Sequence, residues 1–158
     1  MSSRSDQDRA WELIQEIGLC MLVSHDGGGV LRARPMSAHA RRDEDAIYFL
    51  TDRRAHKDDE IEINENVCLA FTGKGARTHL SVSGTANLLD DRARVAELWS
   101  PAARAFWESQ DDPDIRILKV RPTLAEIWDG PGRHATPVAL EAAISPRSRL
   151  GENRKILL

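Results

Sequence analysis

The chain has 158 residues, of which 41% are hydrophobic and 30% charged, and it carries a formal net charge of −3 at pH 7. This length and composition fit a single domain (residues 1–158) whose core is large enough to be stable without metals or disulfides. The slight negative charge gives no net attraction for nucleic acid, and no apolar stretch approaches the roughly 20 residues of a transmembrane helix, so we expect neither a nucleic-acid nor a membrane partner.

The hydrophobic pattern predicts short strands joined by turns, with peripheral helices. Helical spacing over residues 6–18 is followed by strands at 19–24 and 30–38, which flank a glycine-rich turn. The remaining predicted elements are a strand at 46–51, a short charged helix at 57–63, strands at 67–72 and 78–89, helical segments on either side of Ser100-Pro101 within 95–106, and strands at 115–120 and 124–128 around Pro122. Six or seven strands joined mainly by short turns favour a mainly β fold, with an antiparallel sheet closed into a barrel, over alternating βαβ units.

The two ends of the chain and the cysteines complete this outline. Polar residues follow Met1 where a secretory signal would be apolar, and the location is therefore predicted to be cytoplasmic. Cys20 and Cys68 lack a second cysteine at metal or redox spacing, so we expect buried, reduced thiols. The core is expected to cover about residues 8–130, ahead of a mostly polar C-terminal tail at about 131–158.

The common catalytic motifs are absent from the sequence. It contains no glycine-rich dinucleotide or P-loop fingerprint, no serine-hydrolase elbow and no zinc-protease motif. The five histidines are scattered without the paired spacing of a metal site, and no metal is expected.

Positive charge does gather at one predicted helix start. Arg54, His56 and Lys57 lie just before or at the first turn of the helix, where free backbone N–H groups and the helix dipole favour an anion. Arg34 on a neighbouring strand could add a bidentate contact. However, acidic residues at 58–60 could use these cations, with Arg53, as surface ion-pair partners, and the residues alone favour that interpretation over a phosphate site.

A set of segments in the same order resembles a known family. The segments are RARPM (32–36), AIYFLTD (46–52), HKDDEI (56–61), NVCLAF (66–71), LSVSGTA (80–86), LW (98–99), DDPD (111–114) and AEIWDG (125–130). Together, over about residues 8–130, they resemble general stress protein 26, a group within the pyridoxamine 5′-phosphate oxidase-like superfamily of FMN-binding split barrels. The resemblance implies an antiparallel split β-barrel and a homodimer that holds FMN, or alternatively FAD, at the subunit interface.

The resemblance also implies which positions contact the flavin. One strand would lie along the ring and the next would contribute a contacting pair, while two residues at the helix start would hold the phosphate. These positions are Arg34, Pro35, Met36 and Ser37 on the first strand, Leu50 and Thr51 on the second, and His56 and Lys57 at the phosphate. His56 stands where the oxidase branch has arginine, and a neutral imidazole would weaken the charge there.

Two further positions have alternative interpretations. Trp128 resembles a tryptophan near the flavin, although a large aromatic at a strand end can equally be a core or interface anchor. His79 stands where a side chain of the long strand often reaches the flavin, or it is simply solvated on the polar face.

The resemblance implies a stress-related flavoprotein without naming its reaction. A flavin-dependent oxidoreductase acting on a small-molecule redox substrate is the first hypothesis, because flavin itself carries the redox chemistry. The alternatives are a non-catalytic flavin-binding or flavin-sensing protein and a split barrel that holds another planar cofactor, haem or a deazaflavin, with His39 or His79 as a ligand. Residues 90–113 and the adjacent Arg133-His134 depart from the vitamin-B6 oxidase pattern and argue against that activity.

Overall fold

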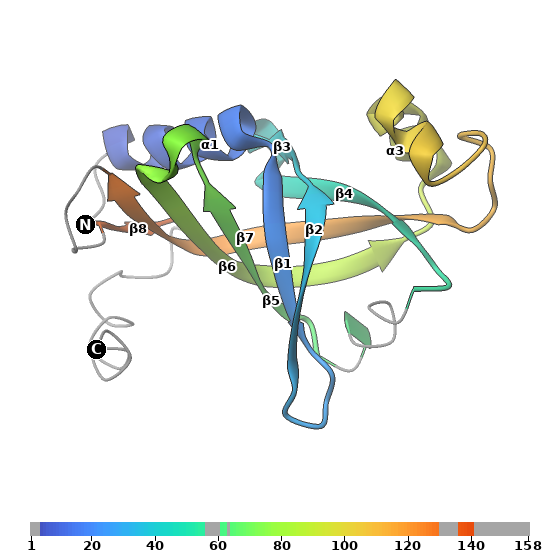
Figure 1. The fold of residues 1–158 in the computed structure, drawn as a ribbon, viewed down its shortest axis with the longest axis horizontal. Coiled ribbons are helices and arrows are strands. Elements are labelled where there is room, and N and C mark those ends of the chain that lie inside the picture. Colours follow the sequence, from blue (N-terminus) through green and yellow to red (C-terminus); the bar gives the residue numbers. More distant parts are fainter. Residues whose placement is uncertain (1–3, 56–60, 63, 130–135, 141–158) are drawn as a thin grey trace.

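The computed structural model describes residues 4–55, 61–62, 64–129 and 136–140. One antiparallel sheet carries helices at its two ends (Figure 1). The elements in chain order are α1 (Arg4–Ile17), β1 (Leu19–His25), β2 (Leu31–Ser37), β3 (His39–Arg41), η1 (Arg42–Glu44), β4 (Ala46–Asp52), β5 (Asn66–Thr72), η2 (Lys74–Ala76), β6 (Thr78–Leu89), α3 (Arg92–Leu98), η3 (Pro101–Ala105), β7 (Ile115–Asp129) and β8 (Thr136–Ala139). Within the described residues, no helix is long and apolar enough to cross a membrane.

The sheet curls into a half-barrel that stays open between β2 and β4. Its strands follow the order β2-β1-β5-β6-β7-β4-β3, and β8 pairs with β7 outside this path. Because β2 leads into β3 through Ala38 alone, the first and last strands of this order are adjacent in the chain. The predicted mainly β, antiparallel split barrel is therefore confirmed, and the gap between β2 and β4 is its split.

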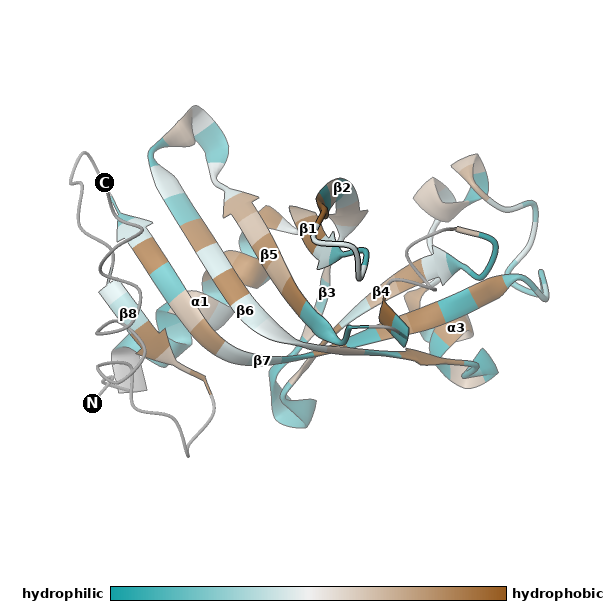
Figure 2. Ribbon diagram, turned by 90° about the horizontal axis from the view of Figure 1, so that it is seen from below, coloured by the Kyte–Doolittle hydropathy of each residue, from teal (hydrophilic) through white to brown (hydrophobic). Residues whose placement is uncertain are grey.

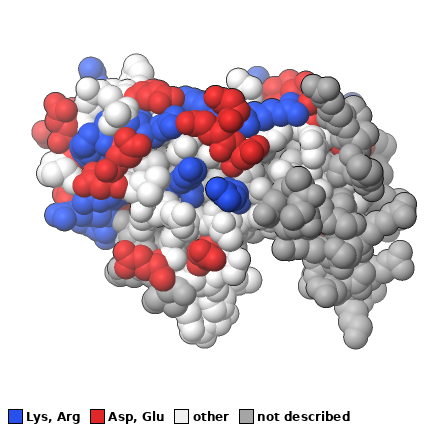
Figure 3. All heavy atoms as spheres, turned by 180° about the vertical axis from the view of Figure 1, so that it is seen from behind, with Lys and Arg blue, Asp and Glu red and all other residues white. Residues whose placement is uncertain are grey.

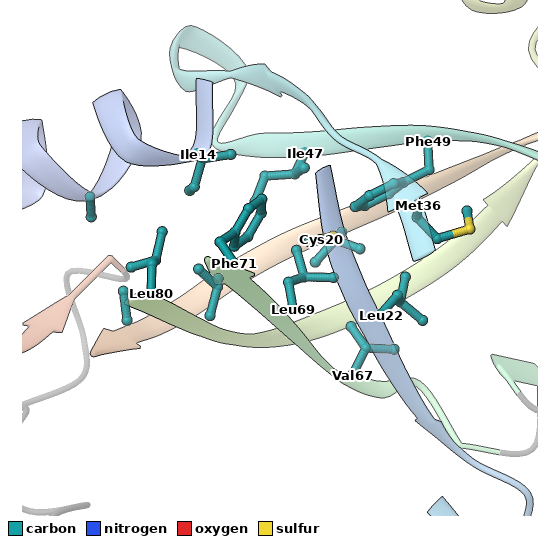
Figure 4. Packing of buried hydrophobic residues seen from close by; sticks show 14 of the residues in the cluster. Ile14, Cys20, Leu22, Met36, Ile47, Phe49, Val67, Leu69, Phe71 and Leu80 are labelled. Carbon is teal, nitrogen blue, oxygen red and sulfur yellow. The ribbon is translucent and has the colours of Figure 1, made fainter. Parts of the chain in front are cut away.

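The main core fills the concave side of the half-barrel. Buried residues alternate along the strands, as the colour bands of β6 illustrate in Figure 2. Figure 4 shows side chains from α1, β1, β2, β4, β5 and β6 that point toward one another. Helix α1 buries Ala10, Leu13 and Ile14 against this core and ends at Gly18, whose positive φ of 68° suits glycine.

A second, smaller core lies on the other face of β4. Ile47 and Phe49 enter the main core, whereas Ala46 and Tyr48 pack with α3, η3 and Ile117. The strand is therefore buried on both faces, which explains its continuous apolar sequence.

The C-terminal strands differ from the prediction. Residues 115–129 form one continuous strand, β7, where Pro122 was expected to separate two. A register shift between Ser83 and Gly84 brings Gly84 opposite Pro122. A β-bulge at this point accommodates a residue without an N–H donor.

One further strand lies within the predicted tail at about 131–158. Strand β8 pairs with β7 and buries Val138 and Ala139, so Thr136–Ala139 belong to the sheet. The side chain of Gln7 donates to the Ala139 carbonyl over 2.8 Å and ties β8 to α1. The prediction failed because four residues carry too little periodicity to indicate a strand. Strand β3, which has only three residues, was missed for the same reason.

Surface charge is mixed. Figure 3 shows Lys and Arg interspersed with Asp and Glu on one face. No single-sign patch forms on that face of the described chain.

The bulge yields a stability test. A Cβ at position 84 would clash with the Arg121 carbonyl oxygen, so Gly84→Ala should lower the free energy of unfolding by about 1–3 kcal/mol. Gly28→Ala is the control, because a Cβ there has space and the residue has no positive φ. Urea unfolding would measure both variants, and equal stabilities would contradict the packing argument.

Candidate functional site

A cavity of about 520 Å³ opens at the split of the barrel. Strands β2 and β4 form one part of its wall, and the segment from α3 to Trp107 forms the other. Its lining residues are Leu19, Arg34, Pro35, Met36, Ser37, His39, Leu50, Thr51, Asp52, Leu98, Ser100, Ala102, Ala103, Phe106 and Trp107. This volume lies within the usual range of about 300–1,000 Å³ for small-molecule sites.

Strand β2 offers an open backbone edge to this cavity. It pairs with β1 on one side and ends the strand order of the described sheet on the other. In an antiparallel strand, alternate residues direct their N–H and C=O groups away from the paired neighbour. Polar backbone groups between Arg34 and Ser37 can therefore meet a ligand.

Arg34 is held in place at the cavity wall. Its Nη1 donates to Ser24 Oγ over 2.7 Å, and Ser24 is buried. A guanidinium has five N–H donors in a planar fork, a geometry that suits planar anionic or carbonyl groups. Arg34 thus brings a fixed positive charge to the lining.

Thr51 contributes a buried hydroxyl to the same wall. Its Oγ1 has no hydrogen-bond partner among the described residues, although the residue is only 1% exposed. An unsatisfied buried polar group costs about 1–3 kcal/mol. A ligand that bonded this hydroxyl would remove that cost.

Asp52 links the end of β4 to the other wall of the cavity. One carboxylate oxygen accepts from Trp107 Nε1 over 3.1 Å and from Arg54 Nη2 over 2.7 Å, and the other accepts from Arg54 Nε over 2.9 Å. The Arg54 guanidinium, assisted by the Arg54 amide and by Trp107, holds the pKa of Asp52 well below its usual range. The carboxylate is therefore ionised at neutral pH and fixes Trp107 in position.

The wall formed by α3 and η3 is mainly apolar, with the polar Ser100 between the two elements. Leu98, Ala103 and Trp107 are buried in the smaller core, while Phe106 is 77% exposed. Sequence analysis missed these residues as part of a site. Their helical spacing indicated packing only, and the exposure of Phe106 depends on the tertiary structure.

His39 also lines the cavity and lies outside the predicted flavin set. It lies on β3 opposite Tyr48. Burial and the nearby Arg41 charge lower its pKa, so its imidazole is neutral at pH 7. It can both donate and accept a hydrogen bond in the cavity.

Comparisons with known proteins identify the family. The family model described as pyridoxamine 5′-phosphate oxidase like matches residues 5–146. The chain belongs to this pyridoxamine 5′-phosphate oxidase-like family. General stress protein 26 of Bacillus subtilis (strain 168) is 27% identical over 136 residues, which cover 81% of this chain and 96% of the relative.

Solved structures agree with this assignment. General stress protein 26 from Bacillus anthracis str. Sterne aligns with a TM-score of 0.73 at 19% identity, over 84% of this chain and 97% of the other. The general stress FMN/FAD binding protein from Xanthomonas citri aligns with a TM-score of 0.67 at 25% identity, over 90% of this chain and 94% of the other. The predicted resemblance to the general stress protein 26 group is confirmed.

The family's predicted flavin positions are divided between two places. Arg34, Pro35, Met36, Ser37, Leu50 and Thr51 all line the cavity. His79 and Trp128 do not. They lie opposite each other on β6 and β7, and Trp128 is eleven positions along β7 from Ile117, the partner of Leu50. At ~3.3 Å per residue this places them roughly 30 Å or more along the strand from the cavity.

Of the positively charged residues near the predicted helix start, the structure describes only Arg53 and Arg54. His56 and Lys57 lie outside the described residues. Arg54 pairs with Asp52 and Asp114, and Arg53 pairs with Asp114. Both arginines therefore form ion pairs, but with Asp52 and Asp114, and the predicted partners at 58–60 lie outside the described residues.

The hydrogen bonds that the Asp52 carboxylate accepts from Arg54 and Trp107 should make the stability of the protein depend on pH. Asp52→Asn should lower the free energy of unfolding at pH 7 by about 1–2 kcal/mol, because Arg54 and Trp107 lose a charged acceptor and solvent screens part of the effect. Since the folded-state pKa is lowered, this contribution is present above the unfolded-state pKa of about 3.9 and is lost as the pH falls through the folded-state value.

Urea unfolding at several pH values would measure this effect. The difference between wild type and Asp52→Asn should be constant from pH 7 to pH 5 and should shrink toward pH 3. Asp90→Asn is the control, because the Asp90 side chain is 60% exposed. A difference that stayed constant to pH 3 would contradict the assignment.

Proposed function

We propose that the chain binds FMN in the cavity at the barrel split and acts through it as a flavin-dependent oxidoreductase. The observation that carries this proposal is the buried Thr51 hydroxyl, without a partner among the described residues, in a cavity that also contains the β2 edge and Arg34. A flavin ring has a polar pyrimidine edge that needs donors and acceptors, and an apolar dimethylbenzene edge that does not. The cavity lining offers both kinds of surface.

Each element of the cavity has a distinct part in this proposal. The β2 backbone from Arg34 to Ser37 would bond the polar edge of the ring, with Thr51 adding a hydroxyl. Leu50 would pack against the ring. Lys57 and His56, which follow Arg54 closely in the sequence, remain the proposed phosphate ligands. When bound, flavin supplies electron transfer in one- or two-electron steps, and the residues of the chain bind it and control access.

The family relationship supports the same ligand. The Xanthomonas citri protein is described as binding FMN or FAD, and the present chain is 25% identical to it. FMN is preferred here because the proposed cation cluster provides for one phosphate, and FAD remains the related ligand with the same ring.

A non-catalytic flavin-binding role and a different planar cofactor are the competing functions. The absorbance spectrum of the purified protein distinguishes flavin from haem or deazaflavin. With FMN bound, oxidation of reduced nicotinamide in the presence of an acceptor then tests catalysis. Turnover no faster than that of free FMN would reject the oxidoreductase and leave the binding role.

Thr51 gives a test that separates ligand binding from folding. Thr51→Val keeps the side-chain shape and removes the hydroxyl, so the apo protein should be as stable as wild type or more stable. FMN affinity should fall about 3- to 10-fold, consistent with the loss of one hydrogen bond of about 1 kcal/mol. Fluorescence titration with FMN and urea unfolding of the apo protein measure the two effects.

Thr123→Val is the matched control for this experiment. The Thr123 hydroxyl donates to the Ser83 carbonyl over 3.1 Å, away from the cavity, so its removal should reduce stability and leave FMN affinity unchanged. If Thr51→Val destabilised the apo protein while FMN affinity stayed at the wild-type value, Thr51 would be excluded from the site.

We also propose that the protein acts as a homodimer. The outer hairpin face, formed by Leu19, Met21, Leu31 and Pro35, is apolar and exposed, and Leu31 reaches 69% exposure. Leu19 and Pro35 also line the cavity, so a second copy on this face would lie beside the ligand. His79 and Trp128, distant from the cavity in their own chain, could then reach it from the second copy.

A charge on the outer hairpin face tests the dimer. Met21→Glu should give a monomer, because a carboxylate would be desolvated in an apolar interface. Since Met21 does not line the cavity, a parallel loss of FMN affinity of tenfold or more would indicate a shared site. Leu89→Glu, also at an exposed apolar position, is the control, and sedimentation measures both. A wild-type monomer that binds FMN would reject the shared site.

A further inference from the structure

Two neighbouring aromatic residues, Phe106 and Trp107, line the cavity. The ring of Trp107 is buried and fixed, and the ring of Phe106 is exposed. The ring centroids of Phe106 and Trp107 lie 5.8 Å apart, with an interplanar angle of 53°. Trp107 is buried and its Nε1 is bonded to Asp52, whereas Phe106 is 77% exposed. The backbone N–H groups of both residues donate to the Ala103 carbonyl, so the turn that presents Phe106 is also held.

The surroundings of Phe106 distinguish it from an isolated exposed apolar residue. Leu98, Ala102 and Ala103 line the same wall, which leaves an apolar surface beside the open ring. Aromatic rings pair favourably with other flat rings in offset or edge-to-face arrangements. A planar aromatic ligand matches this wall better than an aliphatic or globular one.

The charges around the cavity select against an anionic ligand on this wall. Among the described lining residues Asp52 is the only one with a carboxylate, and its lowered pKa keeps it ionised. The cations near it, Arg53 and Arg54, are paired with Asp52 and Asp114. Arg34, the one cation of the described lining, is on the β2 wall, where we have assigned it to the flavin.

From these observations we propose that the α3–η3 wall is the subsite for a second ligand, an uncharged planar aromatic molecule of the quinone type, which stacks on Phe106. This inference rests on the proposed flavin site, since the second ligand would lie between Phe106 and the ring held by β2 and β4. The N–H of neutral His39, which lines the same cavity, provides a hydrogen-bond donor for a carbonyl oxygen of that ligand. Phe106 is thus a specificity residue, and it is not required to hold FMN.

The test measures binding rather than turnover. FMN affinity is determined first, and then the binding of menadione, a neutral planar quinone, is measured by calorimetry on the FMN-loaded protein. Pyridoxal 5′-phosphate, which is planar and anionic, serves as the comparison. We expect menadione to bind at least tenfold more tightly than pyridoxal 5′-phosphate, and more tightly to the loaded protein than to the apo protein.

Matched variants assign the effect to the ring of Phe106. Phe106→Leu keeps an apolar side chain but removes the ring, and it should weaken menadione binding roughly three- to tenfold. Phe106→Tyr keeps the ring and should stay within about twofold of wild type. Val30→Ala, at an exposed apolar position of the β1–β2 turn, is the control for non-specific binding to apolar surface.

Each contrary outcome has a separate meaning. A protein that takes up no FMN loses both the proposed function and this subsite at the first step. FMN binding without menadione binding, or menadione binding that is unchanged by Phe106→Leu, overturns the subsite alone. So does a loss of FMN affinity or of the dimer in Phe106→Leu, since the ring would then serve the cofactor or the interface.

Discussion

The burial of β4 on both faces is the constraint on which the rest of the structure depends. Ile47 and Phe49 fill the half-barrel, while Ala46 and Tyr48 hold α3 and η3 against its outside. Without the second core, the segment from α3 to Trp107 would have no apolar surface to cover, and the cavity would lose a wall. The ring of Tyr48 lies 4.3 Å from the guanidinium carbon of Arg94, which adds a cation–π contact from α3 to the same strand.

The same strand changes role at its C-terminal end. Past Phe49, the next residues, Leu50, Thr51 and Asp52, line the cavity rather than only a core. Asp52 then connects back to the opposite wall through Trp107. The cavity is therefore built on a strand fixed by two cores, and a site supported in this way can hold its polar groups in place before a ligand arrives.

The sequence predicted the sheet well where side chains alternate over many residues. Residues 78–89 were predicted from period-two alternation and form β6 over the same span. Pro122 misled the prediction, because a bulge opposite Gly84 depends on the partner strand and cannot be inferred from one segment. The three- and four-residue strands β3 and β8 are too short for periodicity to indicate them.

Only the β2 and β4 wall of the candidate site could be predicted from the sequence, because only its residues match motifs of the family. The β2 and β4 positions carry motifs in order, whereas the wall that contains Phe106 has a helical pattern that any packed helix would share. The ion pairs of Arg53 and Arg54 were expected from charge alone, but their partners come from Asp52 and from Asp114, which is distant in sequence. The local sequence indicates that a charged residue will form an ion pair, whereas the fold determines which residue is its partner.

The division of the cavity into two unlike walls bears on how such a protein could act. One wall has an open backbone edge, a fixed arginine and a hydroxyl without a partner among the described residues, which suit a ligand that remains bound. The other wall is apolar, with one exposed ring and a neutral imidazole nearby, which suit a ligand that binds weakly and leaves. An enzyme that passes a hydride between a resident ring and a second substrate needs both kinds of surface in one cavity, because hydride transfer requires the two molecules to be in contact. A carrier or sensor of flavin would need the first wall alone. The subsite that we propose on Phe106 is thus the feature that distinguishes an enzyme from a flavin-binding protein without turnover.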